Sequence, residues 1–261
     1  MGGYPIEGRL KSGEKVFIVD FLTLALYARG MREVIHNTDL NYVKFNFKGH
    51  NLTFFGIEGN GDLTAAFSDY DFLDVKDKVV LDVGANIGDS AVYFAVNGAR
   101  KVIAIEPVKE TYNILVRNIM ANNFQDLIIP LPYNLSKISG EVYMNRSDIL
   151  GTGTVLHEDP KSGYKILNVK LGDILNSFDL TDGVLKMDCE GCEYALLNED
   201  DKTLKNIDML QIEYHYGYQR LVNKLKETGF DVKYTKPVKS YNSEAENPRM
   251  EVGYIYAKRI Q

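Results

Sequence analysis

The segment Val79-Val-Leu-Asp-Val-Gly-Ala-Asn-Ile-Gly88 decides the fold of this 261-residue chain. An apolar run typical of a buried strand contains Asp82 near its end, and a turn with glycine at positions 84 and 88 follows. Asp89, Ser90 and an apolar helical pattern come next, so the segment predicts a strand, a glycine-rich turn and a helix start. Glycine allows a tight turn and a close approach of backbone to ligand, because it carries no Cβ atom.

The spacing of this turn distinguishes between two classes of ligand. Its pattern is D-x-G-x-x-x-G, whereas dinucleotide-binding folds carry G-x-G-x-x-G. The missing glycine weakens the case for a pyrophosphate, which favours the amides of a helix N-terminus. Asp82 instead places a carboxylate for a cationic ligand, and S-adenosylmethionine (AdoMet) carries an ammonium and a sulfonium but no phosphate.

Length, composition and charge narrow the class of protein. A chain of 261 residues fits one large domain, or one domain with an appendage. Its residues are 45% apolar and 25% charged, which is ordinary for a globular protein. The net charge of −6 argues against broad binding of nucleic acid or anionic membranes, because such binding needs clustered lysine and arginine.

Two further features bear on the compartment. The chain has only two cysteines, Cys189 and Cys192, which make no disulfide framework and suit a reducing compartment. The apolar run Val16–Ala28 imitates a signal peptide, but Asp20 interrupts it and it is too short to span a bilayer. We therefore expect a cytoplasmic protein in which this run is a buried helix.

The N-terminal part of the chain has its own pattern. Residues 14–36 are predicted as a helix with an apolar face, and residues 42–54 alternate as in a β-hairpin. A further short helix is expected over residues 64–73. Together they predict an N-terminal helix and β-hairpin extension over residues 1–75.

From Val79 onward, strand-like and helix-like segments alternate, which predicts a mostly parallel sheet with helices on both faces. Residues 141–175 interrupt this alternation with two additional strand-like pieces, and an antiparallel hairpin is expected around residues 237–248. This α/β domain is expected over residues 76–261. Its core strands are predicted at Val79–Val83, Val102–Ile105, Leu127–Leu131, Val184–Met187, Met209–Tyr214, Phe230–Tyr234 and Val252–Ala257.

Five segments carry a resemblance to a known family. In chain order they are Val80-Leu-Asp-Val-Gly-Ala-Asn-Ile-Gly88, Ala104-Ile-Glu-Pro107, Tyr133-Asn-Leu-Ser136, Leu185-Lys-Met-Asp-Cys-Glu-Gly-Cys-Glu193 and Ile212-Glu-Tyr-His215. On these segments the chain resembles the FkbM-type AdoMet-dependent methyltransferases. The resemblance implies a class I methyltransferase (Rossmann-like) fold with a seven-stranded sheet. It also implies O-methylation of a hydroxyl on a sugar, polyketide or other small or conjugated acceptor.

The cofactor pocket is expected at the carboxyl ends of the strands, where open α/β sheets bind their ligands. Asp82 and Glu106 end the first two core strands and are expected to be neighbours there. Glu106 is placed to accept hydrogen bonds from the ribose hydroxyls, as the resemblance also implies; a solvated strand-end carboxylate is the alternative. The turn residues expected around the methionine portion are Gly84, Ala85, Asn86 and Gly88. Plain turn chemistry is the alternative for the glycines.

Three further residues are candidates for cofactor contact. Asn134 follows the third strand, in the region that contacts adenine, and its side-chain oxygen can accept a hydrogen bond from the adenine amino group. Capping a turn is the alternative role for Asn134. Ser136 is a weaker candidate in the same region, and Asp188 is a candidate at the end of the fourth strand.

Methyl transfer to a hydroxyl requires alignment of oxygen, methyl carbon and sulfur, and a base near the hydroxyl. Two strand ends supply candidates, Asp188 and Glu190 at one and Glu213 and His215 at the other. Residues two apart on an extended chain face the same way, so Glu213 and His215 are expected to project together. We expect His215, with a reference pKa near ~6.5, to be the base and Glu213 or Asp188 to orient it. The alternatives are a strand-end hydrogen-bond partner for His215 and a helix cap for Asp188.

The same four residues could instead bind a divalent ion, since oxygen-rich clusters suit Mg²⁺ or Mn²⁺. The base is favoured, so no metal is predicted. Cys189 and Cys192 form a C-x-x-C pair at a strand-to-helix turn, as in redox motifs, but a zinc site would need a second ligand pair. Buried, unreactive thiols are the favoured interpretation.

The leading hypothesis is therefore an AdoMet-dependent O-methyltransferase acting on a sugar, glycan or related small or conjugated acceptor. RNA methylation on the same fold is the alternative, against which the acidic charge counts. A non-catalytic AdoMet-binding module is the third hypothesis, and a nicotinamide oxidoreductase is the least favoured. The expected walls of the acceptor pocket are residues 56–62, 70–72, 145–159 and 214–218.

Overall fold

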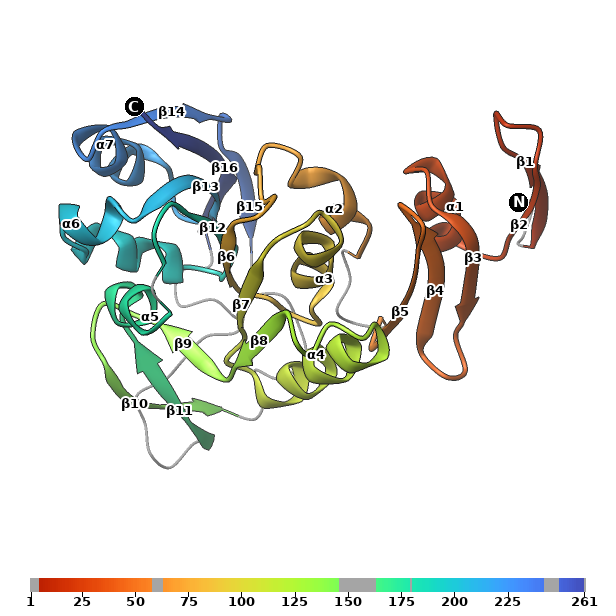
Figure 1. The fold of residues 1–261 in the computed structure, drawn as a ribbon, viewed down its shortest axis with the longest axis horizontal. Helices are drawn as coiled ribbons and strands as arrows, with labels where there is room; N and C mark the ends of the chain where they lie inside the picture. The colour runs from red at the N-terminus through yellow and green to blue at the C-terminus, as the bar shows by residue number, and fades with distance from the viewer. Residues whose placement is uncertain (1–4, 58–62, 146–162, 179, 242–248, 261) are drawn as a thin grey trace.

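The computed structural model describes residues 5–57, 63–145, 163–178, 180–241 and 249–260 (Figure 1). Two of the expected acceptor-pocket segments, residues 58–62 and 146–159, lie outside these ranges. None of the helices in the described ranges is long and apolar enough to cross a membrane.

A mixed sheet forms the centre of the larger part of the molecule (Figure 1). Its strands follow the order β14-β16-β13-β12-β6-β7-β8, and β15 pairs with β16 as an eighth strand. The strands are β6 (Val79–Val83), β7 (Lys101–Ile105), β8 (Ile128–Leu131), β12 (Gly183–Met187), β13 (Ile207–Tyr214), β14 (Phe230–Tyr234), β15 (Val238–Tyr241) and β16 (Arg249–Arg259). Pairing is parallel from β8 to β13, and β16 runs antiparallel to its neighbours.

This strand order confirms the predicted class I fold, with β15 added to its seven-stranded path. From β6 the chain moves outward through β7 and β8, and then returns to β12 on the other side of β6. The direction of winding therefore reverses between β6 and β12. Open α/β sheets bind ligands at such a switch point, outside the carboxyl ends of the strands.

Helices cover both faces of the sheet, as predicted. On one face α3 (Asp89–Val96) and α4 (Lys109–Ala121) pack in a hydrophobic cluster that includes Val80. On the other, α5 (Leu171–Ser177) and α7 (Gln219–Glu227) pack in a second cluster that includes Leu81. Successive strand residues point to opposite faces, so the unbroken apolar run of β6 serves both clusters. The short α6 (Asp201–Leu204) and the 3₁₀ helix η2 (Cys192–Asn198) contribute to the second cluster.

A smaller sheet lies beside the edge strand β8. It consists of β9 (Tyr133–Leu135), β10 (Gly140–Asn145) and β11 (Gly163–Val169), with β11 between the other two. The two strand-like pieces predicted within residues 141–175 are thereby confirmed. After β12 the chain forms the 3₁₀ helix η2, Cys192–Asn198.

The helix predicted over residues 14–36 is wrong. The segment forms β2 (Lys15–Ile18), α1 (Phe21–Ala28) and the start of β3 (Arg32–Asn37). The side chain of Asp20 accepts a hydrogen bond from the Thr23 amide at 2.8 Å, and the Thr23 side chain bonds back to the Asp20 amide. This capping box begins α1 at Phe21, because it satisfies amides that have no partner inside the helix.

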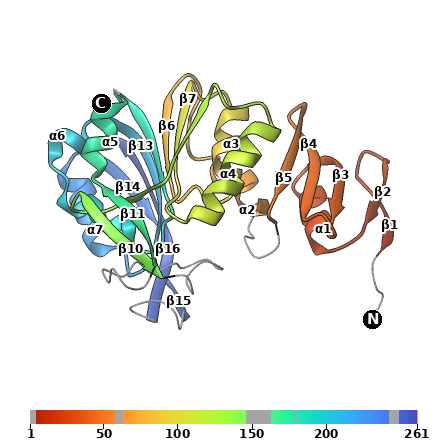
Figure 2. The same ribbon diagram turned by 90° about the horizontal axis from the view of Figure 1, so that it is seen from below.

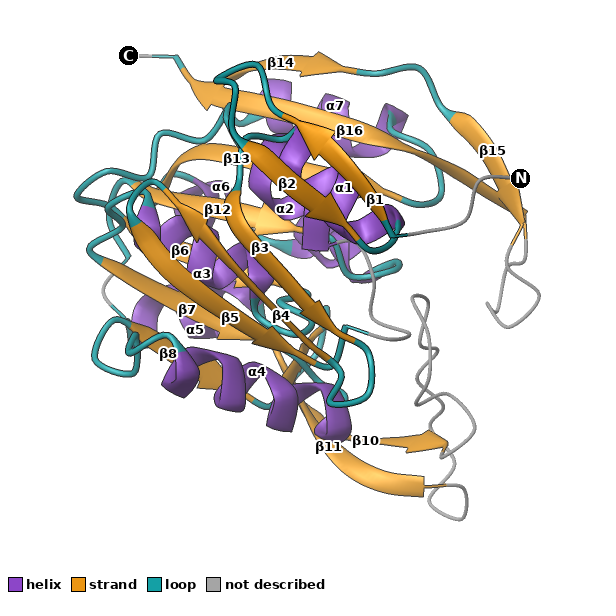
Figure 3. Cartoon of the chain, turned by 90° about the vertical axis from the view of Figure 1, so that its right-hand side faces the viewer, coloured by secondary structure: helices purple, strands orange, loops and turns teal. Residues whose placement is uncertain are grey.

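The remaining N-terminal elements form a layer beside α4. A three-stranded sheet, β3-β4-β5, contains the predicted hairpin as β4 (Tyr42–Phe47) and β5 (His50–Phe55). Before it, β1 (Ile6–Arg9) pairs with β2, and after it comes α2 (Leu63–Asp69). Figures 2 and 3 show β5 as the strand of this layer that faces the larger sheet's helices.

Candidate active site

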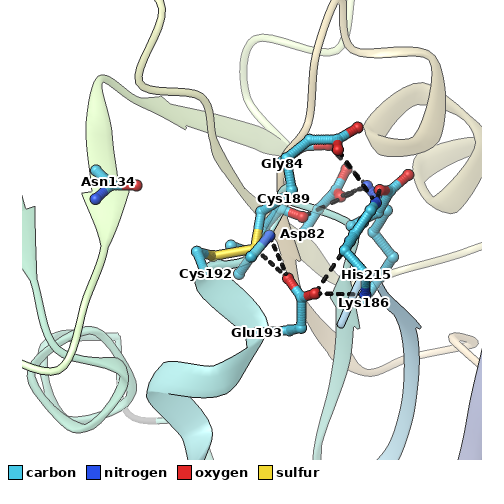
Figure 4. Close-up of a disulfide and its surroundings, with 12 residues drawn as sticks. Asp82, Gly84, Asn134, Lys186, Cys189, Cys192, Glu193 and His215 are labelled. Atoms are coloured by element: carbon cyan, nitrogen blue, oxygen red, sulfur yellow. Dashed lines mark hydrogen bonds and ion pairs between the residues drawn. A yellow bond between two sulfur atoms is a disulfide. The ribbon is translucent and has the colours of Figure 1, made fainter. Parts of the chain in front are cut away.

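The first expected site residue, Asp82, is fully buried in the middle of the sheet. Its neighbour on β12 in register is Lys186, whose Nζ lies 3.2 Å from Asp82 Oδ1 (Figure 4). The Ser90 hydroxyl donates to Asp82 Oδ2 at 2.6 Å. In the structure the cationic partner of Asp82 is therefore Lys186, and a contact of Asp82 with a cationic ligand stays a prediction.

Lys186 is a residue of this site that the sequence pattern did not single out. Its ammonium also donates to the Gly84 carbonyl at 2.7 Å, so it ties the glycine turn to β12. Burial opposes its charge, but Asp82, together with Tyr70, Asp188 and Asp89, outweighs burial and raises the pKa of Lys186. The available signal was a lysine inside the otherwise apolar strand Gly183–Met187. Tyr70, an expected wall of the acceptor pocket, has its ring centre 5.9 Å from this ammonium.

The glycine turn passes very close to the end of β12. Gly84 has a φ of 76°, and a Cβ atom built on it would lie 1.8 Å from the Asp188 carbonyl oxygen. The amides of Gly84 and Ala85 both donate to the Ile105 carbonyl, at 3.0 and 2.9 Å. The turn is therefore held between β7 and β12, and Gly88 follows as the N-cap of α3.

Glu106 lies at the carboxyl end of β7 and adjoins this turn. Its Oε2 accepts a hydrogen bond from the Asn86 amide at 3.1 Å, and its Oε1 accepts one from the Val108 amide at 2.8 Å. Burial raises the pKa of Glu106 to about 7. Each carboxylate oxygen can accept a further hydrogen bond, so the proposed contact with ribose hydroxyls is chemically available.

Asn134 and Ser136 lie apart from this group. Figure 4 shows Asn134 on a separate strand, and its Nδ2 donates to Asn168 Oδ1 at 2.8 Å. The Ser136 amide donates to the Val169 carbonyl at 2.9 Å. Both residues thus join β9 to β11, and their contact with adenine stays a prediction.

A second group of side chains, here called the acid–imidazole cluster, follows the ends of β12 and β13. It consists of Asp188, Glu190, Glu213 and His215. The Nε2 atom of His215 lies 3.3 Å from Glu190 Oε2 and 3.9 Å from Asp188 Oδ1. Asp188, Glu190 and His215 each offer one atom that could bind a metal ion, and these atoms lie within 4.8 Å of one another. Two adjacent strands thus bring these expected catalytic residues together.

The residue that orients His215 is Glu193, and not Glu213 or Asp188 as expected. Glu193 Oε1 accepts hydrogen bonds from the His215 amide at 2.9 Å and from its Nδ1 at 3.0 Å (Figure 4). The side chains of His215 and Glu193 are 4% and 0% exposed. Glu193 ends one of the segments that carry the family resemblance, but no role was predicted for it from the sequence.

The electrostatics of the cluster differ from those of an isolated histidine. Burial lowers the pKa of His215, but its hydrogen bond to Glu193 and the surrounding carboxylates outweigh burial and raise that pKa to about 9. Burial, together with the charge of Asp188, raises the pKa of Glu213 to about 7. The ordinary histidine pKa, which favoured His215 as the base, therefore does not apply in this arrangement.

The expectation of free thiols is also wrong. Cys189 and Cys192 form a disulfide, with their Cα atoms 5.4 Å apart. Glu190 and Gly191 between them both have positive φ, 56° and 118°, and this tight turn brings the two cysteines together. A reducing compartment was expected because the two cysteines were expected to be free thiols. The disulfide removes this support for a reducing compartment.

Comparisons with known proteins agree with this geometry. The family model described as the methyltransferase FkbM domain matches residues 82–232. The chain is 31% identical over 144 residues to the hexuronic acid methyltransferase AglP of Haloferax volcanii, which is 54% of this chain and 58% of AglP. It is 27% identical over 163 residues to the uncharacterized protein 158B of Sulfolobus islandicus rod-shaped virus 1, which is 62% of this chain and 72% of that protein. The match thus spans little more than half the length of AglP.

Among solved structures, M. jannaschii TYW2 in complex with AdoMet is similar at 19% identity, with a TM-score of 0.45 and coverage of 87% of this chain and 90% of that one. The family model spans more than half of the chain, and it covers the glycine turn, Glu106 and the strand ends that carry the acid–imidazole cluster. The predicted family is thereby confirmed, and this chain belongs to the FkbM methyltransferase domain family.

Proposed function

We propose that this chain is an AdoMet-dependent methyltransferase that methylates a hydroxyl group of a sugar or glycan. The observation that carries the proposal is the position of the acid–imidazole cluster. It lies at the carboxyl ends of β12 and β13, and the backbone of its member Asp188 lies against the glycine turn after β6. Donor and acceptor would therefore meet at the switch point of the sheet.

The residues around the glycine turn fit AdoMet better than a phosphate-containing cofactor. The turn does not match the G-x-G-x-x-G pattern of dinucleotide sites, and Glu106, which accepts a hydrogen bond from the Asn86 amide of this turn, offers its carboxylate to ribose hydroxyls. Lys186 neutralises Asp82 and keeps the turn closed on β12. When bound, AdoMet supplies an electrophilic methyl group.

The protein itself has two tasks: it aligns the acceptor hydroxyl with the methyl group of AdoMet, and it removes the proton of that hydroxyl. The acceptor hydroxyl must point at the methyl carbon, in line with the sulfur. The acid–imidazole cluster offers hydrogen-bond partners for that hydroxyl and groups that take its proton. Glu193 keeps the imidazole fixed during this step, because it bonds both to the ring and to the His215 amide.

A sugar acceptor is supported by the relative named as a hexuronic acid methyltransferase. A hexuronic acid offers two kinds of oxygen, hydroxyl and carboxylate. Only the hydroxyl needs to lose a proton at neutral pH, and the acid–imidazole cluster supplies groups for that task. We therefore assign the hydroxyl as the methylated group.

Binding of AdoMet is tested by calorimetry on the purified chain. Wild type is expected to bind, and Glu106→Gln is expected to bind about tenfold more weakly, because it loses a charged acceptor for the ribose hydroxyls. Asp126→Asn, at an exposed carboxylate, is the control and should bind as wild type. Absence of binding by wild type would contradict the proposal.

Methylation is tested with methyl-labelled AdoMet and oligosaccharides that contain uronic acid. The proposal expects label that survives mild alkali, as a methyl ether does. Alkali-labile label would instead indicate a methyl ester on the carboxylate and would refute the assignment of the hydroxyl. Label found only in added RNA would refute the acceptor class.

A further inference from the structure

We propose that Asp188, Glu190 and His215 bind one divalent cation of the Mg²⁺ or Mn²⁺ type, and that this cation binds the acceptor hydroxyl. Only the second part rests on the function proposed above. The residue pattern favoured a base at this position over a metal. The tertiary structure reverses that preference through the distances at His215 and through Glu193.

The distances fit a single ion. Nε2 of His215 is 3.3 Å from Glu190 Oε2 and 3.9 Å from Asp188 Oδ1. In octahedral coordination at about 2.1 Å, ligand atoms lie about 3.0 Å apart when adjacent and about 4.2 Å apart when opposite. One ion can therefore contact all three side chains with small rotations of the two carboxylates.

The second observation is the bond on the other side of the imidazole. A carboxylate only accepts hydrogen bonds, so Glu193 places the ring proton on Nδ1. Nε2 then faces the oxygens of Asp188 and Glu190, and a positive charge at Nε2 offsets their negative charge. Without metal that charge is a second ring proton, and a divalent cation can take its place. Histidines that bind metals almost always donate their other N–H in this way, to a carboxylate or a carbonyl.

Glu193 is itself firmly placed, which a carboxylate in a random acidic cluster is not. Its Oε1 accepts from both the ring and the amide of His215, and its Oε2 accepts from the Gly191 amide at 2.8 Å. The side chain is fully buried. The imidazole therefore has one orientation, with Nε2 directed at the two ligand carboxylates.

The site also leaves room for an acceptor. Asp188 and Glu190 are 36% and 26% exposed, whereas His215 and Glu193 are buried, so the candidate ligands lie at the boundary of the protein. Three protein ligands leave coordination positions for water or for oxygens of a sugar. A cation there lowers the pKa of a bound hydroxyl. The hydroxyl loses its proton to Glu213, the member of the acid–imidazole cluster that is not a ligand, its oxygen forms a bond to the methyl carbon, and the carbon–sulfur bond breaks to give a neutral thioether.

The test is direct binding of Mn²⁺ to the full chain after chelator treatment. Binding is measured from the decrease of the electron paramagnetic resonance signal of free Mn²⁺. Wild type is expected to bind one ion, and Mg²⁺ is expected to compete for it. Glu190→Gln is expected to weaken binding at least tenfold, as is Glu193→Gln, which changes only the support of His215. Glu227→Gln, at an exposed carboxylate on α7, is the control and should match wild type.

Thermal unfolding of each variant shows whether it is folded. If Glu193→Gln does not fold, Glu190→Gln decides the test, because Glu190 is only partly buried. Equal Mn²⁺ binding by wild type and Glu190→Gln, or no binding by either, would overturn the site and leave a proton as the cation on Nε2. Methyl transfer that persists in chelator without Mn²⁺ binding would refute the cation and leave the methyltransferase standing. Mn²⁺ binding without methyl transfer would support the cation site and refute the proposed methyltransferase function.

Discussion

Gly84 lies where the turn after β6 passes the end of β12. We predict that Gly84→Ala lowers the free energy of unfolding by about 3 kcal/mol, because its Cβ would lie 1.8 Å from the Asp188 carbonyl oxygen and the backbone must shift. Gly49→Ala is the matched control. Gly49 has a similar φ of 84°, but nothing lies within 4 Å of its Cβ position, so about 1 kcal/mol is expected. Urea unfolding measures both losses, and equal losses would contradict the close approach.

The buried pair of Asp82 and Lys186 sets a second prediction at the residue scale. Lys186→Met leaves the Asp82 carboxylate buried without its counterion, and we expect a loss of about 3–5 kcal/mol. Asp82→Asn combined with Lys186→Met should lose much less than the sum of the two single variants, because neither charge remains. Chemical denaturation at neutral pH gives the three values. Additive losses would show that the two residues do not act as a pair.

At the scale of elements, Asn118 of α4 and Asn122, the C-cap of α4, hold the edge of β5. Asn122 bonds the amide and the carbonyl of Thr53, each at 2.8 Å, and Asn118 does the same for Phe55 at 2.8 and 3.2 Å. These side chains take the place of a neighbouring strand, because an amide group offers both a donor and an acceptor. They attach the N-terminal layer to the larger sheet.

We predict that Asn122→Ala destabilises the protein by about 2 kcal/mol, since it leaves partly buried backbone groups of Thr53 without partners. Asn113→Ala, on the exposed face of the same helix, is the control and should cost nothing. Hydrogen exchange provides the specific readout. Faster exchange of the β5 amides in Asn122→Ala alone is expected, and unchanged exchange would contradict the role of this side chain.

At the scale of the whole molecule, one hydrophobic cluster crosses the proposed boundary between residues 75 and 76. It joins Leu52 and Phe54 of the N-terminal layer to Phe94 of α3 and Val80 of β6. We therefore predict a single cooperative unfolding transition for the chain, because neither part keeps a complete core without the other. Differential scanning calorimetry tests this prediction. Two separated transitions would show that residues 1–75 fold as an independent domain.

Local patterns were sufficient for most elements. The strands Val79–Val83 and Phe230–Tyr234 are observed as predicted, since a short apolar run and an alternation of apolar and polar residues are both local patterns. In the N-terminal segment the apolar residues suit one long helix as well as the observed order of strand, helix and strand. The capping box at Asp20 was the local signal that a new helix begins at Phe21.

The sequence by itself determined the glycine turn, the alternation of strands and helices, the family, and the strand ends at which Asp188 and His215 lie. These follow from periodicity and spacing along one segment of chain. Only the tertiary structure decided that Lys186 neutralises Asp82, that Glu193 orients His215, and that Cys189 and Cys192 are joined. Such pairings depend on strand neighbours, strand register and the backbone angles of one turn, so residue spacing alone does not specify them.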